Sequence, residues 1–175
     1  MHLANLDSVT RSYMLDEINA DISRDALYLS PRLSERGRRD YPGLLLAAAG
    51  KGDAAGLAAM LRRAGRLNGT ETATRAGLTV SRRVPVSAAD TLAEGEFNRF
   101  YVRGLCRRAA AEEVPELVVY RAKQVRQPRP ESEARIGTAI DPARLLGDMR
   151  AYASEQDGPG IPPGPNSGLS VRLPS

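Results

Sequence analysis

Apolar residues near the start of the chain recur at steps of three and four positions, which is the spacing of one face of a helix. This pattern, which includes Met14 and Ile18, predicts a helix over residues 5–23. Asn5 or Asp7 can cap it, because a short polar side chain accepts hydrogen bonds from the free amides of a first turn. Shorter helical segments are predicted at residues 34–40, 44–49 and 53–64. The first third is therefore expected to form a small bundle of helices.

The clearest helical pattern covers residues 88–112, where apolar positions form a continuous stripe. Both phenylalanines of the chain, Phe97 and Phe100, lie on this stripe, so we expect their rings in the core. Residues 116–123 (ELVVYRAK) are rich in β-branched and aromatic side chains and form the one convincing strand. A last helix is predicted over residues 141–152.

Residues 66–83 do not continue the helical periodicity. Asn68-Gly69 is a turn signal, and the Thr, Ala, Arg and Gly residues that follow it show no helical spacing. We interpret this segment as a loop that is either flexible or ordered by a partner.

These patterns predict an α+β fold that is predominantly helical, with one or two short strands. A single domain is expected over residues 1–153, followed by an extended arm rich in Pro and Gly over residues 154–175. The alternative is an all-α bundle in which the strand at 117–123 pairs only with the arm.

The arm combines a stiff proline-rich segment with an alternating apolar segment at its end. Alternation of this kind suits a strand that is added to the edge of a neighbouring sheet. We expect the arm to dock on another subunit; the alternatives are that it folds back on strand 117–123 or stays disordered. Its candidate contact residues are Ile161, Pro162, Pro163, Leu169, Val171 and Leu173.

Charge is distributed unevenly along the chain. The 25 basic residues include only two lysines and stand against 21 acidic residues, which gives a net charge of +4. Residues 62–135 hold 15 basic and 9 acidic residues, whereas the segments on either side are each net negative. The excess of Arg over Lys is typical of a GC-rich genome, but its concentration in the middle indicates a positive surface.

Arg99, Arg103 and Arg107 follow one another at a spacing of four, with Arg108 beside them. On a helix this spacing places the first three on one ridge. We name these four residues the arginine ridge. It can be a solvated face with Glu96 and Glu112 as local ion partners, a contact with an acidic protein surface, or a track for a phosphate backbone.

Few residues in the sequence are suited to catalysis. The single histidine is His2 and the single cysteine is Cys106, so a zinc site, a disulfide framework and a His-based triad have too few members. No phosphate-binding loop motif is present. We therefore assign no catalytic residue, cofactor or metal, and expect a protein that is not an enzyme.

Nothing in the sequence indicates a membrane or an export signal. No apolar run reaches the roughly 20 residues that span a bilayer. The first residues carry neither the basic nor the apolar region of a signal peptide. The expected location is the cytoplasm of a bacterial host.

Several stretches resemble a family of small, largely uncharacterised proteins of tailed phages and prophages. They are NLDSVTRSYMLDEI, LYLSPRL, LAEGEFNRFYVRGLCRRA, VVYRAKQVRQPRPESEARIG and PPGPNSGLSVRLP, and they are distributed along nearly the whole chain, from residue 5 to residue 174. The resemblance implies a phage setting and carries over no catalytic residue.

Two functions are compatible with these expectations. The first is a structural protein of the virion, a capsid decoration or head–tail connector component whose arm binds phage structural proteins or copies of itself. It would occupy the host cytoplasm before assembly. The alternative is a phage nucleic-acid-binding or regulatory protein that uses the basic region 62–135.

Overall fold

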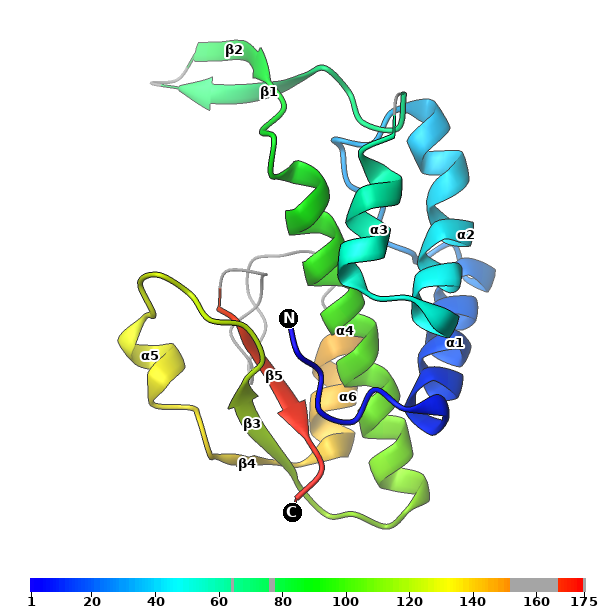
Figure 1. The fold of residues 1–175 in the computed structure, drawn as a ribbon, viewed down its shortest axis with the longest axis vertical. Coiled ribbons are helices and arrows are strands. Elements are labelled where there is room, and N and C mark those ends of the chain that lie inside the picture. Colours follow the sequence, from blue (N-terminus) through cyan, green and yellow to red (C-terminus); the bar gives the residue numbers. More distant parts are fainter. Residues whose placement is uncertain (64, 76–77, 152–166, 175) are drawn as a thin grey trace.

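The computed structural model describes residues 1–63, 65–75, 78–151 and 167–174. Helix α4 (Ala88–Ala111) runs through the middle of the molecule. Helices α1, α2 and α3 lie on one side of it, and α6 and a small sheet lie on the other (Figure 1). The predicted α+β, mainly helical fold is confirmed.

The helices α1 and α3 begin where the sequence places capping aspartates. Asp7 accepts a hydrogen bond from the Thr10 amide at 3.0 Å, and Asp53 accepts one from the Gly56 amide at 2.7 Å. Each carboxylate satisfies an amide that has no partner within its helix. Besides α4, the described helices are α1 (Ser8–Ser23), α2 (Glu35–Lys51), α3 (Ala54–Leu61), α5 (Pro130–Glu133) and α6 (Pro142–Ala151).

Helix α2 is one continuous helix, so the predicted break between residues 34–40 and 44–49 is wrong. Pro42 lies inside it, although a proline in a helix interior costs about 3 kcal/mol. Tyr41 and Leu45 on either side are fully buried. Burial of these side chains against the rest of the bundle offsets the cost of the proline.

The predicted strand at 116–123 is confirmed as β3 (Leu117–Arg121), the middle strand of a three-stranded antiparallel sheet. Its neighbours are β4 (Ala139–Ile140) and β5 (Leu169–Arg172). In the register of β3 and β5, Val119 lies opposite Val171. Both side chains are buried, so this sheet closes one side of the core.

The C-terminal residues 167–174 are part of the folded body, which corrects the expectation of an arm docked on another subunit. Leu169 and Val171 are buried in the core of their own chain. The Tyr101 hydroxyl on α4 donates to the Val171 carbonyl at 3.1 Å, and the Leu173 amide donates to the Asn5 side chain at 2.9 Å. The predicted alternative, folding back on strand 117–123, is what the structure has.

Within the described residues, the last part of the predicted arm (154–175) packs on the predicted domain (1–153). Strand β5 packs with the domain, because the apolar alternation of the last residues matches the open edge of β3. The boundary itself and the candidate contacts Ile161, Pro162 and Pro163 lie outside the described residues.

Residues 70–75 and 78–83 pair as an antiparallel hairpin, so the predicted loop over 66–83 is wrong for these two segments. Strand β1 (Thr70–Arg75) pairs with β2 (Leu78–Arg83) in full register, from Thr70 opposite Arg83 to Arg75 opposite Leu78. The hairpin projects from the body near the start of α4 (Figure 1). None of the side chains described in these two strands belongs to the hydrophobic core.

Helix α4 is buried on most of its surface because other elements pack around it. Phe97, Phe100 and Tyr101 are buried, as the apolar stripe predicts. Gly104 lets α1 approach closely, since a Cβ at this position would lie 2.8 Å from the Met14 Cγ and 2.9 Å from its amide nitrogen. This close contact places α1 directly against the helix that carries the arginine ridge.

Candidate functional site

The arginine ridge is not an exposed surface, because its central member is fully buried. Arg103 donates to Glu17 at 2.7 and 2.9 Å and to Asp21 at 2.6 and 2.9 Å. Both carboxylates come from α1, which packs directly on α4. The guanidinium also lies 4.8 Å from the centre of the Phe100 ring. Arg103 is thus a core residue that joins two helices, and its assignment as an interaction residue is corrected.

The other ridge members also find carboxylates within the chain. Arg99 is mostly buried and lies 3.4 Å from Glu96, while Arg107 lies 3.5 Å from Glu17. Arg108 contacts both Asp7, at 2.6 Å, and Glu112, at 2.8 Å. The predicted local partners Glu96 and Glu112 are confirmed. The structure therefore does not support this ridge as a track for DNA or a protein partner.

Glu17 is the centre of this buried ion cluster. Burial raises the pKa of Glu17, but hydrogen bonds from Arg150 and Arg103 outweigh burial and hold the pKa at about 2. Arg150 from α6 reaches it at 2.6 Å. The cluster therefore ties α1, α4 and α6 together while the carboxylate stays ionised.

We expect this cluster to make the stability depend on acid pH. The folded pKa of Glu17 lies below its ordinary value of 4.5, so stability is present above pH 4.5 and is lost as pH falls toward 2. The difference between the unfolded and folded pKa values of Glu17 corresponds to about 3 kcal/mol of the free energy of unfolding. Urea unfolding at pH 5 and pH 2.5 measures it, and Glu17→Gln is expected to reduce the difference between the two values. Equal free energies of unfolding for wild type at both pH values would contradict this expectation.

The lone cysteine has no nucleophilic character. Cys106 is buried in α4, and burial raises the pKa of its thiol to about 12. Such a thiol stays protonated at neutral pH. Among the described residues, no three His, Cys, Asp or Glu side chains are grouped as metal ligands. No helix in the described ranges is both long enough and apolar enough to cross a membrane.

The β1–β2 hairpin is the most exposed element and becomes the candidate site. Leu78 is 69% exposed, Val80 is 37% exposed, and Val86 just after the hairpin is 95% exposed. Exposing apolar side chains to water is unfavourable, and a partner that covered them would gain the free energy of burying their surface. Every described residue of β2 is exposed, so the strand has no third strand or helix covering it.

The two faces of the hairpin differ in chemistry. Because directly opposed residues share a face, the register groups Ala73 with Val80 and Glu71 with Arg82 on one side. Leu78 belongs to that side by strand alternation. The other side carries hydroxyl groups and one arginine: Thr70, Thr72, Thr74, Thr79, Ser81 and Arg83.

The hairpin is fixed to the body at its root. Glu71 accepts from Arg32 at 2.5 Å and from Arg82 at 2.8 Å, and both arginines hold the pKa of Glu71 below its ordinary value, the Arg32 hydrogen bond being the largest cause. A pocket of about 160 Å³ opens beside this contact. It is lined by Tyr28, Ser30, Pro31, Arg32, Glu71, Ala88, Thr91 and Leu92.

Positive charge gathers at the same end of the molecule. We define the hairpin end as residues 31–40 and 62–90, which meet through the Leu33–Leu67 bridge and the bond from the Ser34 amide to the Arg66 carbonyl. These segments hold ten arginines and four carboxylates, a net charge of +6. The rest of the chain is therefore net −2. Of the net charge of +6 that residues 62–135 carry, +4 lies in 62–90 at this end and +2 in 91–135.

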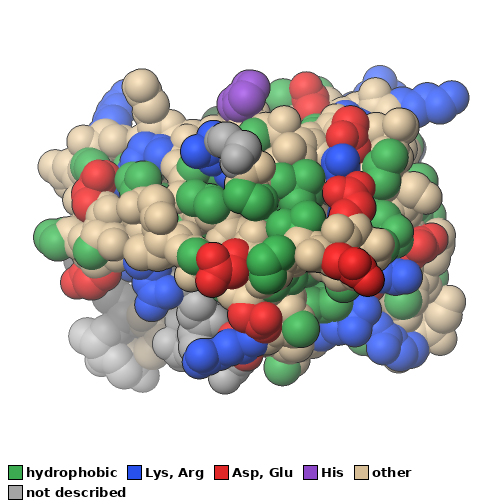
Figure 2. Space-filling model, turned by 90° about the horizontal axis from the view of Figure 1, so that it is seen from below, with side chains coloured by type: hydrophobic (Ala, Val, Ile, Leu, Met, Phe, Trp, Pro, Cys, Tyr) green, Lys and Arg blue, Asp and Glu red, His purple; other side chains and the backbone are tan. Residues whose placement is uncertain are grey.

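The opposite end of the molecule does not show a comparable excess of basic side chains (Figure 2). Figure 2 shows that face from below, with hydrophobic side chains gathered across its middle and acidic and basic groups around them. No single charge dominates it.

Three comparisons with known proteins give no match: no family model, no curated protein and no solved structure is similar to this chain. Its function is therefore argued from its own residues.

Sequence reasoning missed the hairpin although a signal was present. TETATR has threonine at every second position, and in LTVSRR the hydroxyl residues Thr79 and Ser81 alternate with Leu78, Val80 and Arg82. Ala76-Gly77 separates the two segments in the sequence. Two such runs around a two-residue connection containing glycine are typical of a hairpin. The absence of a strong apolar face concealed it, because that face is what usually marks a strand.

Proposed function

We propose that this chain is a non-enzymatic structural protein of a tailed-phage particle, a capsid decoration or head–tail connector component. We propose further that its hairpin contacts a neighbouring subunit. The phage setting rests on the resemblance described for five stretches of the sequence, 72 of its 175 residues in all. The contact is supported by one observation: Leu78 in the hairpin and Val86 just after it have the largest exposed fractions among the large hydrophobic side chains described, and Val80 beside them is exposed as well.

A hairpin of this kind is suited to a protein contact. Two strands alone are marginally stable in water, and their outer edges keep backbone groups free for pairing. A neighbouring subunit that covers the face of Ala73, Leu78 and Val80 would stabilise the hairpin and bury its apolar groups. The C-terminal strand cannot supply this contact, because Leu169 and Val171 already fill the core of their own chain.

The test is co-sedimentation of the protein with phage particles from a purified lysate. Wild type is expected with full and empty particles in stoichiometric amount. For the variant Leu78→Ser with Val80→Thr, the amount of protein bound to particles is expected to fall at least about tenfold. A loss of about 1.4 kcal/mol of binding free energy is enough to lower the affinity by that factor. Circular dichroism and unfolding of this variant should match wild type, because neither residue is in the core.

The matched control replaces two exposed apolar residues of the body, Val9→Thr with Ile136→Ser, which are 46% and 39% exposed. The control is expected to co-sediment as wild type does. Wild type remaining at the top of the gradient would refute the virion role. Equal binding by the hairpin variant and wild type would refute the hairpin contact.

A further inference from the structure

We propose that the hairpin end binds the phosphate backbone of double-stranded DNA through Arg38, Arg39, Arg63 and Arg83. These four exposed residues come from α2, from the segment after α3, and from the last position of β2. This inference does not rest on the proposed function, since a protein can bind DNA whether or not it joins particles.

The carboxylates of the hairpin end are largely occupied by other arginines. Asp40 lies 2.8 Å from Arg66 and 3.7 Å from Arg36, and the Arg66 hydrogen bond is the largest cause that holds its pKa below the ordinary value. Asp90 is paired with Arg62.

Glu71 is likewise shared by Arg32 and Arg82. Glu35 is the fourth carboxylate of this end. Within the described residues, none of the four proposed DNA contacts lies at ion-pair distance from a carboxylate. Their charge is therefore available to an external anion.

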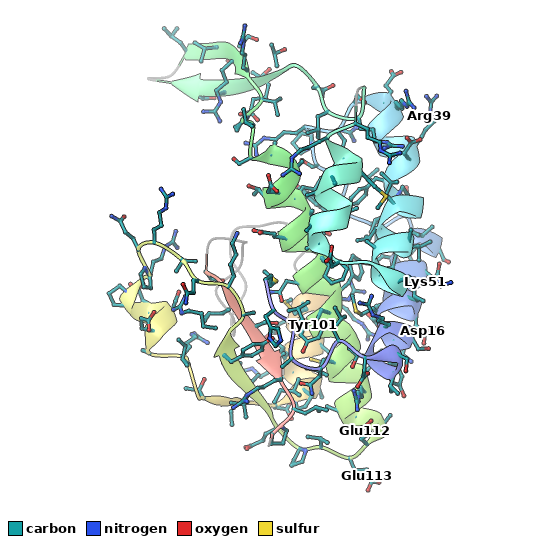
Figure 3. The ribbon with its side chains drawn as sticks, in the orientation of Figure 1. Asp16, Arg39, Lys51, Tyr101, Glu112 and Glu113 are labelled. Carbon is teal, nitrogen blue, oxygen red and sulfur yellow. The ribbon has the colours of Figure 1, made fainter. Side chains whose placement is uncertain are left out.

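The four arginines come from three separate segments of the hairpin end: Arg38 and Arg39 from α2, Arg63 from the segment after α3, and Arg83 from β2. Arg39 lies at the end of α2 that faces the same way as the hairpin (Figure 3). Arg83 lies at the root of the hairpin, opposite Thr70. Cations separated in this way match a repeating line of phosphates better than a single small anion, which would contact one or two of them.

The hydroxyl face of the hairpin favours the same ligand. Thr72 lies opposite Ser81 and Thr74 opposite Thr79, all beside Arg83 on one face. Short hydroxyl side chains donate to phosphate oxygens, and a two-stranded ribbon fits the width of the major groove of DNA. This face is the reverse of the apolar face that we assign to a protein neighbour.

A duplex suits this end better than a single strand. Proteins that bind single strands present exposed aromatic rings on which bases stack. Here Tyr41, Phe97, Phe100 and Tyr101 are buried, and Tyr28 is half-buried in the pocket wall. Among the described residues of the hairpin end, no aromatic ring is exposed. Binding is therefore expected to depend on charge and on backbone contacts.

The test is fluorescence anisotropy with the full chain and a labelled 30-base-pair duplex of mixed sequence, titrated between 50 and 200 mM NaCl. Each neutralised phosphate contributes about 0.9 to the slope of log affinity against log salt. The variant with Arg38, Arg39, Arg63 and Arg83 changed to Ala is expected to lose about 3–4 of that slope and at least about tenfold in affinity at 50 mM salt.

The matched control changes four exposed arginines elsewhere, Arg126, Arg129, Arg144 and Arg172, to Ala, which removes the same net charge. It is expected to retain the wild-type slope within about one. An equal loss in the control, or no binding by wild type at 50 mM salt, would overturn the proposal.

Two further probes separate other ligands. Tighter binding to a single strand of the same length would overturn the assignment to duplex DNA. Binding to poly-L-glutamate without binding to the duplex would point to an acidic protein and overturn it as well. The variant Leu78→Ser with Val80→Thr is expected to bind the duplex as wild type does, so a failed hairpin contact and failed DNA binding give different results.

Discussion

Replacing Arg103 with methionine is expected to destabilise the protein by about 3–5 kcal/mol. Methionine fills a similar volume, so the loss comes from charge and hydrogen bonds and not from a cavity. The four hydrogen bonds to Glu17 and Asp21 disappear, and two buried carboxylates that face each other lose the cation between them. Glu17 keeps its contact with Arg150 and Asp21 keeps its contact with Arg24, but both lose their fully buried cation, and removing one partner of a buried ion pair is strongly destabilising.

Urea unfolding at pH 7 measures this effect. Arg107→Met on the same helix is the control, because the Arg107 side chain is 37% exposed and its pairs with Asp16 and Glu17 are long, at 3.8 and 3.5 Å. The control is expected to lose less than about 1 kcal/mol. An Arg103 variant as stable as the control would contradict the description of Arg103 as a buried core residue.

A chain that ends at Asp157 is expected not to fold cooperatively. The truncation removes β5 and with it Leu169 and Val171, whose burial contributes about 1.5–3 kcal/mol each. The hydroxyl of Tyr101 and the side chain of Asn98 lose partners in β5, at about 1–3 kcal/mol each. The sum is comparable to the whole stability of a typical domain, about 5–15 kcal/mol.

Far-ultraviolet circular dichroism with thermal unfolding distinguishes the outcomes. The matched control ends at Leu173 and keeps all of β5, so it is expected to unfold as the full chain does. A chain ending at Asp157 that unfolds in one sharp transition at the wild-type temperature would show that the last strand is an independent arm, as the sequence alone suggested.

Local patterns in the sequence predict the helices well but not what surrounds them. The stripe on residues 88–112 identifies α4 and its buried rings. Arg103 was placed on a polar face because its partners Glu17 and Asp21 are more than 80 positions away in the chain. A signal existed: Glu17 falls on the mostly apolar face of α1 with Met14 and Ile18. A carboxylate on such a face indicates a buried cation as its partner.

The strands show the same division between local and long-range information. Alternation at 169–173 correctly predicts a strand but not its neighbour, because any open sheet edge accepts such a strand. The choice of β3 depends on where α4 places Tyr101 and Asn98, which no local pattern reveals. At 70–75 and 78–83 the alternation lacks a buried apolar face, so the sequence pattern predicts a loop where the structure has an exposed hairpin.

Hydrogen–deuterium exchange of the purified full chain tests the central claim, that the C-terminal strand belongs to the core and the hairpin is the element left for partners. Peptides that cover residues 169–172 are expected to exchange as slowly as those of α4, because they open only with the core. Peptides that cover residues 78–83 are expected to exchange orders of magnitude faster. Rapid exchange at 169–172 together with protection at 78–83 would contradict the claim.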